Sequence, residues 1–190
     1  FLMAIDFFLE RFKANPDRVA LIFREQEYSY QWLYDKIFEF YALIQKNEIK
    51  EGAVVALLSD FNPNSVAMMF AIIMNNSIFV PFSFAVKSLD EFLEISESQF
   101  LITINDGNVS VEKKRDEINH HFLKQLNTQL HPGLILFSSG STGKSKAAVH
   151  DFIPLLDKFR VERHTLRTIT FLLFDHIGGV NTLLYILSNT

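Results

Sequence analysis

The chain has 190 residues, 48% of them apolar, and a formal net charge of −4 at pH 7. This length and apolar content suffice for one good-sized domain or two small lobes with a buried core, and they exclude a disordered chain. The 18 lysines and arginines are scattered among 22 acidic residues, which argues against a nucleic-acid binder, and the lack of cysteine excludes disulfides, zinc–thiolate sites and thiol nucleophiles.

The first 50 residues predict two helices separated by a strand. An opening amphipathic helix, ended by the Asn-Pro-Asp turn at residues 15–17, is predicted from apolar residues at helical spacing: Leu2, Ile5, Leu9 and Phe12. A short buried strand is expected at residues 19–23, and residues 24–27 are expected to turn the chain toward the second helix. The apolar stripe of that helix consists of Leu33, Ile37, Tyr41 and Ile44.

Three short apolar runs predict further strands, and a helical pattern lies before the second and the third of them: residues 54–58, 78–82 and 100–104. Asn62 and Pro63 supply an N-cap and a first-turn proline for the first of these helices. Ser88, with Glu91 three residues later, predicts a capping box for the second, which is expected to extend to Ser98.

Helices and continuous apolar strands thus alternate, which indicates an α/β fold with a layered, largely parallel sheet flanked by helices. The turn at residues 105–108 is expected to close a small hairpin, and a polar helix is expected from residue 113 to 129. The His-Pro-Gly break that follows predicts a boundary between a first α/β lobe, residues 1–130, and the start of a second lobe, residues 131–190.

The second lobe is expected to begin with a strand at residues 134–137 and the phosphate-loop candidate described below. A helical pattern at residues 152–164, an apolar strand at 169–174 and a final helix follow it. The chain begins with Phe1 and stops after an apolar helical pattern, so we expect a piece of a longer protein whose remaining domains lie outside these 190 residues.

The most informative segment is the run "LILFSSGSTGKSKAAVH" at residues 134–150. Its glycines leave backbone N–H groups sterically open, and its four hydroxyls can donate to phosphate oxygens. Two lysines, Lys144 and Lys146, add positive charge at the same place, and charge-assisted bonds to phosphate are stronger than neutral ones. The segment therefore predicts a polyphosphate-binding loop directly behind a buried strand, rather than a plain Ser/Gly turn.

One candidate for this loop is the P-loop of NTPases, because Gly143, Lys144 and Ser145 reproduce the end of the Gly-x-x-x-x-Gly-Lys-Ser/Thr pattern. The first glycine of that pattern is missing, since Ser138 stands there. A P-loop also leads straight into a helix, which the residues after Lys146 do not favour.

Taken as a whole, the segment resembles the phosphate-loop signature of the AMP-forming adenylating enzymes, which include acyl- and aryl-CoA synthetases, luciferases and the adenylation domains of peptide synthetases. Residues 138–143 match the signature, Lys146 matches its lysine and His150 falls in register. Ser145 replaces the usual proline and Ala147 the usual glycine, which puts the stiffness and reach of the loop's exit in doubt.

The resemblance extends in order over nearly the whole chain. "ANPDRVALIFREQEYSYQWL" is similar to the family's opening segment, and "IKEGAVVALLSDFNPNSVAMMFAIIMNNSIFVPFS" to a later strand–helix–strand unit in which Ala53 replaces an acidic residue and Asn76-Ser77 the usual Ala-Gly. "FLLFDHIGGVNTLL" resembles the segment that borders the family's carboxylate pocket.

The resemblance implies an ATP-dependent ligase that joins a carboxylic acid to AMP, releases pyrophosphate and passes the acyl group to the thiol of coenzyme A or a carrier protein. It implies ATP, Mg²⁺ and coenzyme A as cofactors. It implies that Lys146 neutralises the departing pyrophosphate, and that the nucleotide phosphates bind at Ser138, Ser139, Gly140, Ser141, Thr142, Gly143, Lys144 and Lys146. The family's Thr-Glu motif, ribose-binding Asp and C-terminal catalytic Lys would belong beyond residue 190, so we expect these 190 residues alone to be an incompetent ligase.

The same resemblance implies that His176, Gly178 and Gly179 form part of the acyl-pocket wall, whereas the residues alone also allow a helix-start histidine without a ligand. His150 is interpreted as structural, and His120 and His121 as surface residues whose spacing does not suit a metal site. No metal ligands are predicted.

The longest apolar run, residues 66–74, is far shorter than the roughly 20 residues that cross a bilayer, and the opening segment carries Asp6 and Glu10. We therefore expect no membrane span, no signal peptide and a cytoplasmic location. A P-loop-type NTPase and a non-catalytic nucleotide-binding or scaffold protein that keeps the fold remain as alternatives. The carboxylic acid, the acceptor and the oligomeric state are left open by the sequence.

Overall fold

The computed structural model describes residues 4–138, 146–169, 174 and 176–190. The helices in this part of the chain are α1 (Asp6–Ala14), α2 (Tyr30–Lys46), α3 (Pro63–Met74), α4 (Leu89–Ile95), α5 (His121–Gln129), α6 (Phe152–Asp157) and α7 (Ile177–Ser188). The strands are β1 (Val19–Phe23), β2 (Gln26–Ser29), β3 (Val54–Leu58), β4 (Ile78–Phe82), β5 (Phe100–Asn105), β6 (Asn108–Lys113), β7 (Gly133–Ser138) and β8 (Lys146–Asp151).

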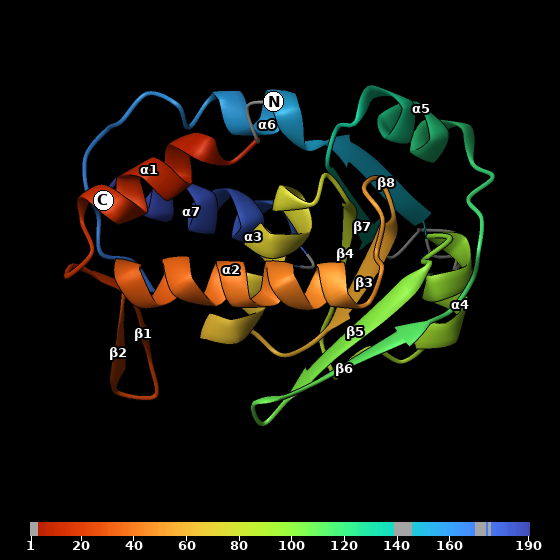
Figure 1. Ribbon diagram of the computed structural model, residues 1–190, viewed down its shortest axis with the longest axis horizontal. Helices are drawn as coiled ribbons and strands as arrows, with labels where there is room; N and C mark the ends of the chain where they lie inside the picture. Colours follow the sequence, from red (N-terminus) through yellow and green to blue (C-terminus); the bar gives the residue numbers. More distant parts are fainter. Residues whose placement is uncertain (1–3, 139–145, 170–173, 175) are drawn as a thin grey trace.

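The main sheet has six strands in the order β6-β5-β3-β4-β7-β8, and helices flank it (Figure 1). The four inner strands are parallel, whereas β6 and β8 pair antiparallel at the two edges. This arrangement confirms the predicted α/β class with a largely parallel sheet. The apolar runs fit it because strands covered on both faces need apolar side chains on both.

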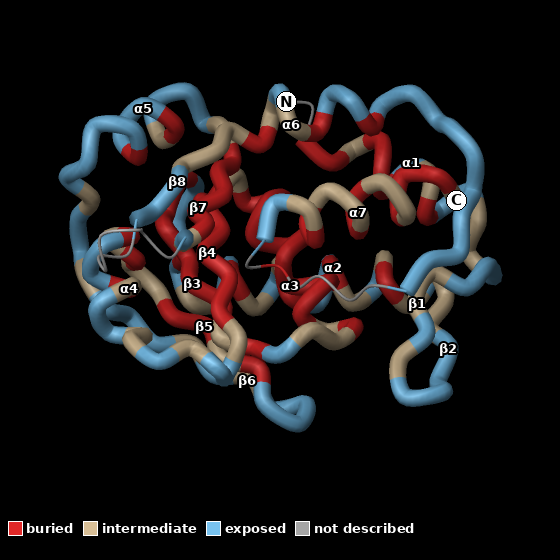
Figure 2. The backbone as a smooth tube through the Cα atoms, turned by 180° about the vertical axis from the view of Figure 1, so that it is seen from behind, coloured by how far each residue is buried: buried red, intermediate tan, exposed pale blue. Residues whose placement is uncertain are grey.

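The two faces of the sheet contribute to two separate cores. Figure 2 shows that the buried residues gather in the interior, along β3, β4, β7 and α3. Alternate residues of β3 show the division: Val55 and Leu57 pack with α1, α2, α3, α6 and α7, whereas Val54 and Ala56 pack with α4 and α5. The helix α3, which follows β3, therefore lies on one face of the sheet, and α4, which follows β4, lies on the other.

This change of face makes a topological switch point in the order β4-β3-β5, at the carboxyl ends of β3 and β5. After β3 the chain moves to β4 on one side, and after β4 it returns across β3 to pair β5 on the other side. Neighbouring parallel strands whose connections leave on opposite faces have an open crevice between their carboxyl ends, which is where α/β sheets bind ligands.

The first strand prediction is wrong about burial. β1 pairs only with β2, in a separate two-stranded hairpin, and its Val19 and Ile22 are exposed. Residues 24–27, expected to turn the chain, therefore also include the first two residues of β2, Gln26 and Glu27. The turn itself is Arg24-Glu25, with φ of 49° and 65°, the left-handed backbone that a two-residue hairpin turn uses.

Two predicted helices are shorter in the structure. The helix expected over residues 113–129 begins only at His121, because Lys113 still pairs with Phe100 as the last residue of β6. The helix expected over residues 152–164 ends at Asp157, and the residues from Arg160 to Ile169 are exposed.

The capping prediction for α4 is also wrong. Ser88 is the residue before the helix, but its side chain makes no capping hydrogen bond and the helix ends at Ile95. Its backbone has φ −128° and ψ 50°, outside the extended conformation that a capping serine normally adopts. In contrast, Asn62 accepts from the Ser65 amide at 3.0 Å, and the Ser65 hydroxyl accepts from the Asn62 amide at 2.9 Å.

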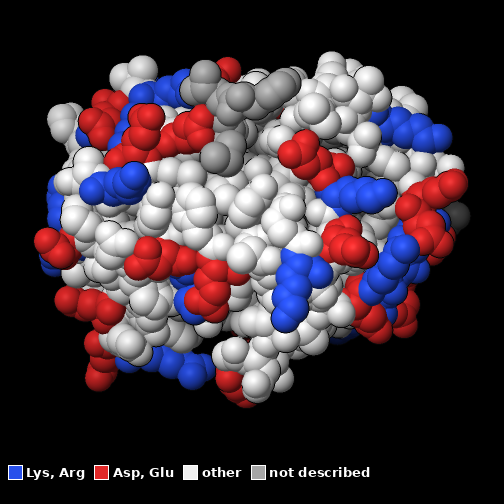
Figure 3. Space-filling view, viewed as in Figure 1, with Lys and Arg blue, Asp and Glu red and all other residues white. Residues whose placement is uncertain are grey.

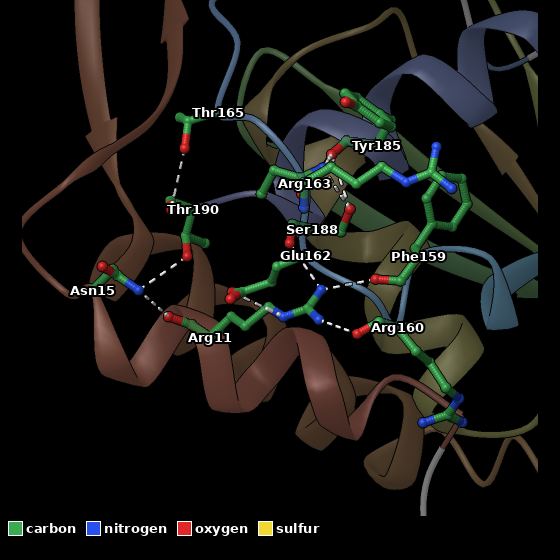
Figure 4. A network of polar contacts seen from close by, with 11 residues as sticks. Arg11, Asn15, Phe159, Arg160, Glu162, Arg163, Thr165, Tyr185, Ser188 and Thr190 are labelled. Atoms are coloured by element: carbon green, nitrogen blue, oxygen red, sulfur yellow. Dashed lines mark hydrogen bonds and ion pairs between the residues drawn. The ribbon is translucent and has the colours of Figure 1, made fainter.

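A partly buried arginine connects the first helix with the end of the chain (Figure 4). Arg11 Nη1 donates to the carbonyl oxygens of Phe159 and Ser188, each at 2.8 Å, and Arg11 Nε lies 3.2 Å from Glu162. Burial lowers the pKa of Arg11 below its usual value, and the carboxylates of Glu162 and Glu10 oppose that change. The guanidinium therefore holds α1 against α7 and the segment after α6.

β7 and β8 belong to the same sheet as β3, β4 and β5. The predicted division at residue 131 into two lobes concerns a longer protein and stays a prediction. Within the described residues, no helix combines the length and apolar character needed to cross a bilayer.

Candidate functional site

The two described ends of the phosphate-loop candidate lie side by side. β7 and β8 pair antiparallel, with Ser138 directly opposite Lys146. Directly paired residues place their side chains on the same face of a sheet, so the Ser138 hydroxyl and the Lys146 ammonium share one face. Both residues are exposed. The segment between them starts and ends at one point of the sheet edge.

This hairpin argues against the P-loop interpretation. A P-loop runs from a strand into a helix whose N-terminus faces the phosphates. Here residues 146–151 form a strand that runs back along β7. Among the described residues, a strand therefore stands where a P-loop NTPase would have the helix that holds the nucleotide.

Most of the predicted phosphate-binding residues fall outside the part of the chain that the structure describes. These are Ser139, Gly140, Ser141, Thr142, Gly143 and Lys144. The structure fixes the two flanking positions, Ser138 and Lys146, and leaves the others as sequence predictions.

A small crevice lies between the carboxyl ends of β3 and β4. Its lining comes from the ends of both strands and from the segment before α7: Leu57, Ser59, Phe61, Pro81, Phe82, Ser83 and Phe174. The Phe174 ring lies 4.9 Å from the Phe61 ring and 6.0 Å from the Phe79 ring, measured between centroids. The start of α7 is thus anchored over the carboxyl ends of β3 and β4.

The predicted pocket residues are next to this crevice in the chain. His176 is the exposed residue before α7, and its carbonyl oxygen accepts from the amides of Gly179 and Val180. Gly178 and Gly179 are in the first turn of the helix, where Gly179 is buried. The structure therefore gives these two glycines helical positions and brings His176 within two residues of Phe174.

The other histidines lie elsewhere. His150 is in β8, opposite Leu134, and His120 and His121 are exposed with stacked rings at the start of α5. His131 Nδ1 lies 2.8 Å from Asp151 Oδ2, which ties the start of β7 to the end of β8. Across the described ranges, no three histidine or acidic side chains gather as a metal site would require.

Charges of both signs alternate on the face of the molecule in Figure 3, where lysines and arginines lie among aspartates and glutamates. No stripe of a single sign forms among the described residues of that face. On this face, positive charge therefore comes from individual lysines and arginines.

A family model described as "AMP-binding enzyme" matches residues 8–189. The chain belongs to the AMP-binding enzyme family.

Individual members of the AMP-binding enzyme family are distant from this chain. Tyrocidine synthase 3 of Brevibacillus parabrevis is 24% identical over 154 residues, which cover 75% of this chain and 2% of that protein. The N-terminal subdomain of Klebsiella oxytoca NpsA, solved in complex with 3-hydroxyanthranilyl-AMSN, superimposes with a TM-score of 0.75 at 20% identity, covering 97% of this chain and 50% of that one. O-succinylbenzoate coenzyme A synthetase (MenE) of Bacillus subtilis, in complex with AMP, gives a TM-score of 0.68 at 18% identity over 96% and 53% of the two chains. The chain thus spans about half the length of the solved structures that it matches.

Sequence reasoning missed the crevice residues of this family member at the ends of β3 and β4, above all Ser59, Phe61 and Ser83. Their signal was their position, since Ser59 and Ser83 directly follow buried strands and Phe61 is two residues beyond Ser59. Recognising them required the strand order, because the sequence does not show that β3 and β4 are neighbours whose connections leave on opposite faces.

Proposed function

We propose that this chain is part of an ATP-dependent ligase that activates a carboxylic acid as an acyl-adenylate. A carboxylate oxygen bonds to the α-phosphorus of ATP, the bond from that phosphorus to the bridging oxygen breaks, and pyrophosphate leaves. The observation that carries the proposal is the register of β7 and β8, which puts Lys146 opposite Ser138 at the two ends of a Ser/Thr/Gly-rich segment.

Lys146 is proposed to bind the β- and γ-phosphates and to neutralise the charge that grows on the leaving pyrophosphate. A positioned cation is suited to this step, because the barrier depends on bringing two anions together and stabilising developing charge. The hydroxyl of Ser138 and the donors predicted at residues 139–144 would complete the phosphate site. Mg²⁺ would be bound by the phosphate oxygens as the counter-ion of ATP.

The crevice between β3 and β4 is proposed to lie beside the binding site of the carboxylic acid. Its lining combines aromatic rings with the hydroxyls of Ser59 and Ser83, and α7 begins next to it. The amino end of a helix carries partial positive charge, which favours a carboxylate there. His176, Gly178 and Gly179 would form the wall of this site.

The second step is proposed to be attack of a thiol on the acyl carbonyl carbon, with release of AMP and formation of a thioester. The acceptor is coenzyme A or a carrier-protein thiol. The similarity to a coenzyme A synthetase supports the first. The similarity to tyrocidine synthase 3 and to an adenylation–PCP di-domain protein supports the second.

Calorimetric titration of the 190-residue chain with inorganic pyrophosphate tests the phosphate site directly. Lys146→Ala is expected to weaken pyrophosphate binding by about 10- to 100-fold, because a hydrogen bond to a charged group contributes about 1.5 to 3 kcal/mol. Lys146→Arg is expected to keep most of the affinity, since it keeps the positive charge.

Lys50→Ala is the matched control, because Lys50 is an exposed lysine before the amino end of β3, whereas Lys146 lies at the carboxyl end of the parallel β7. It is expected to bind pyrophosphate like the wild type. Equal affinities of the wild type and Lys146→Ala, or no binding by the wild type, would contradict the proposal and favour a non-catalytic scaffold.

A further inference from the structure

The strand that leads into the phosphate-loop candidate separates from its inner neighbour. β3 and β4 are in register at five positions, from Val54↔Ile78 to Leu58↔Phe82. Over the described residues of β4 and β7, the register covers only Ile78↔Gly133 and Phe79↔Leu134. The second half of β7, which ends at Ser138, is therefore paired on one side only, by β8.

Pro81 explains why the pairing with β7 stops. The carbonyl oxygen of Phe82 accepts from the Ser59 amide at 2.9 Å, so the backbone groups of Phe82 point toward β3. Neighbouring residues of an inner strand point their backbone groups to opposite sides, so those of Pro81 point toward β7. The next bond of the ladder would run from residue 81 to the carbonyl oxygen of Ile135, and proline has no N–H to donate.

Three aromatic rings fill the place where the ladder stops. Phe92 of α4 stacks on Phe137 of β7, with centroids 4.3 Å apart and an angle of 12° between the rings. The Phe82 ring lies 5.9 Å from that of Phe92 and 5.7 Å from that of Phe137. Phe137 comes directly before Ser138 and pairs with Ala147, the neighbour of Lys146. The stack therefore contacts β7 one residue before Ser138, at the position that pairs with the residue after Lys146 in β8.

We propose that Phe92 is a positioning residue for the phosphate site. Its ring replaces the missing ladder bonds between β4 and β7 and sets the direction in which the β7–β8 hairpin presents Ser138 and Lys146. Phe92 touches no substrate and acts through Phe137. This inference rests on the proposed function for its ligand, and on the geometry of the hairpin for its structural part.

Two measurements on the 190-residue chain test the proposal. Phe92→Ala is expected to weaken pyrophosphate binding by about 3- to 10-fold, the range that corresponds to loss of an aromatic pair. It is also expected to speed hydrogen exchange of the Leu136 and Ala148 amides, which face each other across β7 and β8, because the hairpin then opens more often. Phe92→Tyr keeps the ring and should restore both properties, whereas Phe92→Leu fills the space without a ring and should not.

Leu123→Ala is the control for general loss of stability, since Leu123 is buried in the same core but belongs to α5. It should lower the melting temperature and leave pyrophosphate affinity unchanged. Wild-type affinity and exchange rates in Phe92→Ala, or equal effects of Phe92→Ala and Leu123→Ala, would overturn the proposal. If the wild type and Lys146→Ala bind pyrophosphate equally, the proposed function fails, and the exchange rates alone then decide whether Phe92 positions the hairpin.

Discussion

Tyr30 shows how burial changes the chemistry of a single residue. It is the first residue of α2, it is 4% exposed, and its ring stacks on Phe12 of α1 at 5.1 Å. Burial raises the pKa of Tyr30 above its ordinary value, and the charge of Arg18 opposes this rise. The phenol therefore stays neutral in the folded protein at a pH where an exposed tyrosine begins to ionise.

This difference predicts an alkaline loss of stability. Below about pH 10 the phenol is neutral in both the folded and the unfolded protein, so it adds no pH dependence. Above that pH the unfolded chain releases the proton more readily, so the free energy of unfolding falls as pH rises toward the folded pKa. Tyr30→Phe should show a shallower fall in urea unfolding between pH 9 and 11.

Tyr34→Phe, in the same helix but partly exposed, is the comparison for loss of a phenol. It should follow the pH dependence of the wild type. Parallel pH profiles for the wild type and Tyr30→Phe would show that burial of Tyr30 has no such effect.

Two helix starts that look alike in sequence behave differently in the structure. Asn62 caps α3 through a reciprocal pair of bonds with Ser65, and its Nδ2 also donates to the carbonyl oxygen of Asp60 at 2.8 Å. Ser88 precedes α4 without a side-chain capping bond. A cap depends on the backbone conformation of the capping residue, which is decided by the connection before the helix.

Asn62→Ala should therefore lower the free energy of unfolding by about 1 to 2 kcal/mol, whereas Ser88→Ala should change it by less than about 0.5 kcal/mol. Chemical unfolding of the two variants beside the wild type measures both values. A loss for Ser88→Ala as large as that for Asn62→Ala would mean that Ser88 caps α4 after all.

The contacts of Arg11 join the beginning and the end of the chain. Besides the carbonyl oxygens of Phe159 and Ser188, the guanidinium donates to that of Arg160. Asn15, one turn further along, donates to Thr190 Oγ1 at 2.9 Å. Because the Arg11 guanidinium donates to carbonyl oxygens both of α7 and of the segment after α6, this one side chain supports the contact of α1 with both.

Arg11→Met should lower the free energy of unfolding by about 2 to 4 kcal/mol, since it leaves several carbonyl oxygens without a charged donor. Urea unfolding measures the loss. Arg18→Ala removes an exposed arginine from the turn after α1 and should cost less than about 0.5 kcal/mol. Similar losses in the two variants would show that the Arg11 contacts contribute little.

On its own, the sequence determined the α/β class, most elements of the sheet and the position of the phosphate-loop candidate. Continuous apolar runs such as residues 54–58 and 78–82 indicate strands buried on both faces, and the Ser/Thr/Gly run indicates backbone and hydroxyl donors. The sequence alone shows these two features because each depends on residues close together in the chain. The same local signals failed for β1, whose apolar residues are not in the main sheet. They also failed at the carboxyl end of β6, where a helix was predicted from residue 113, because a polar segment is compatible with either a helix or a strand.

Only the tertiary structure decided which strands are neighbours, that the loop candidate returns as β8 with Lys146 opposite Ser138, and that Phe61, Ser83 and Phe174 share one crevice. These facts depend on strand order, register and the face on which each connection leaves the sheet. Such long-range relations are set by the packing of segments distant in sequence, and the hydrophobic periodicity along the chain does not determine them.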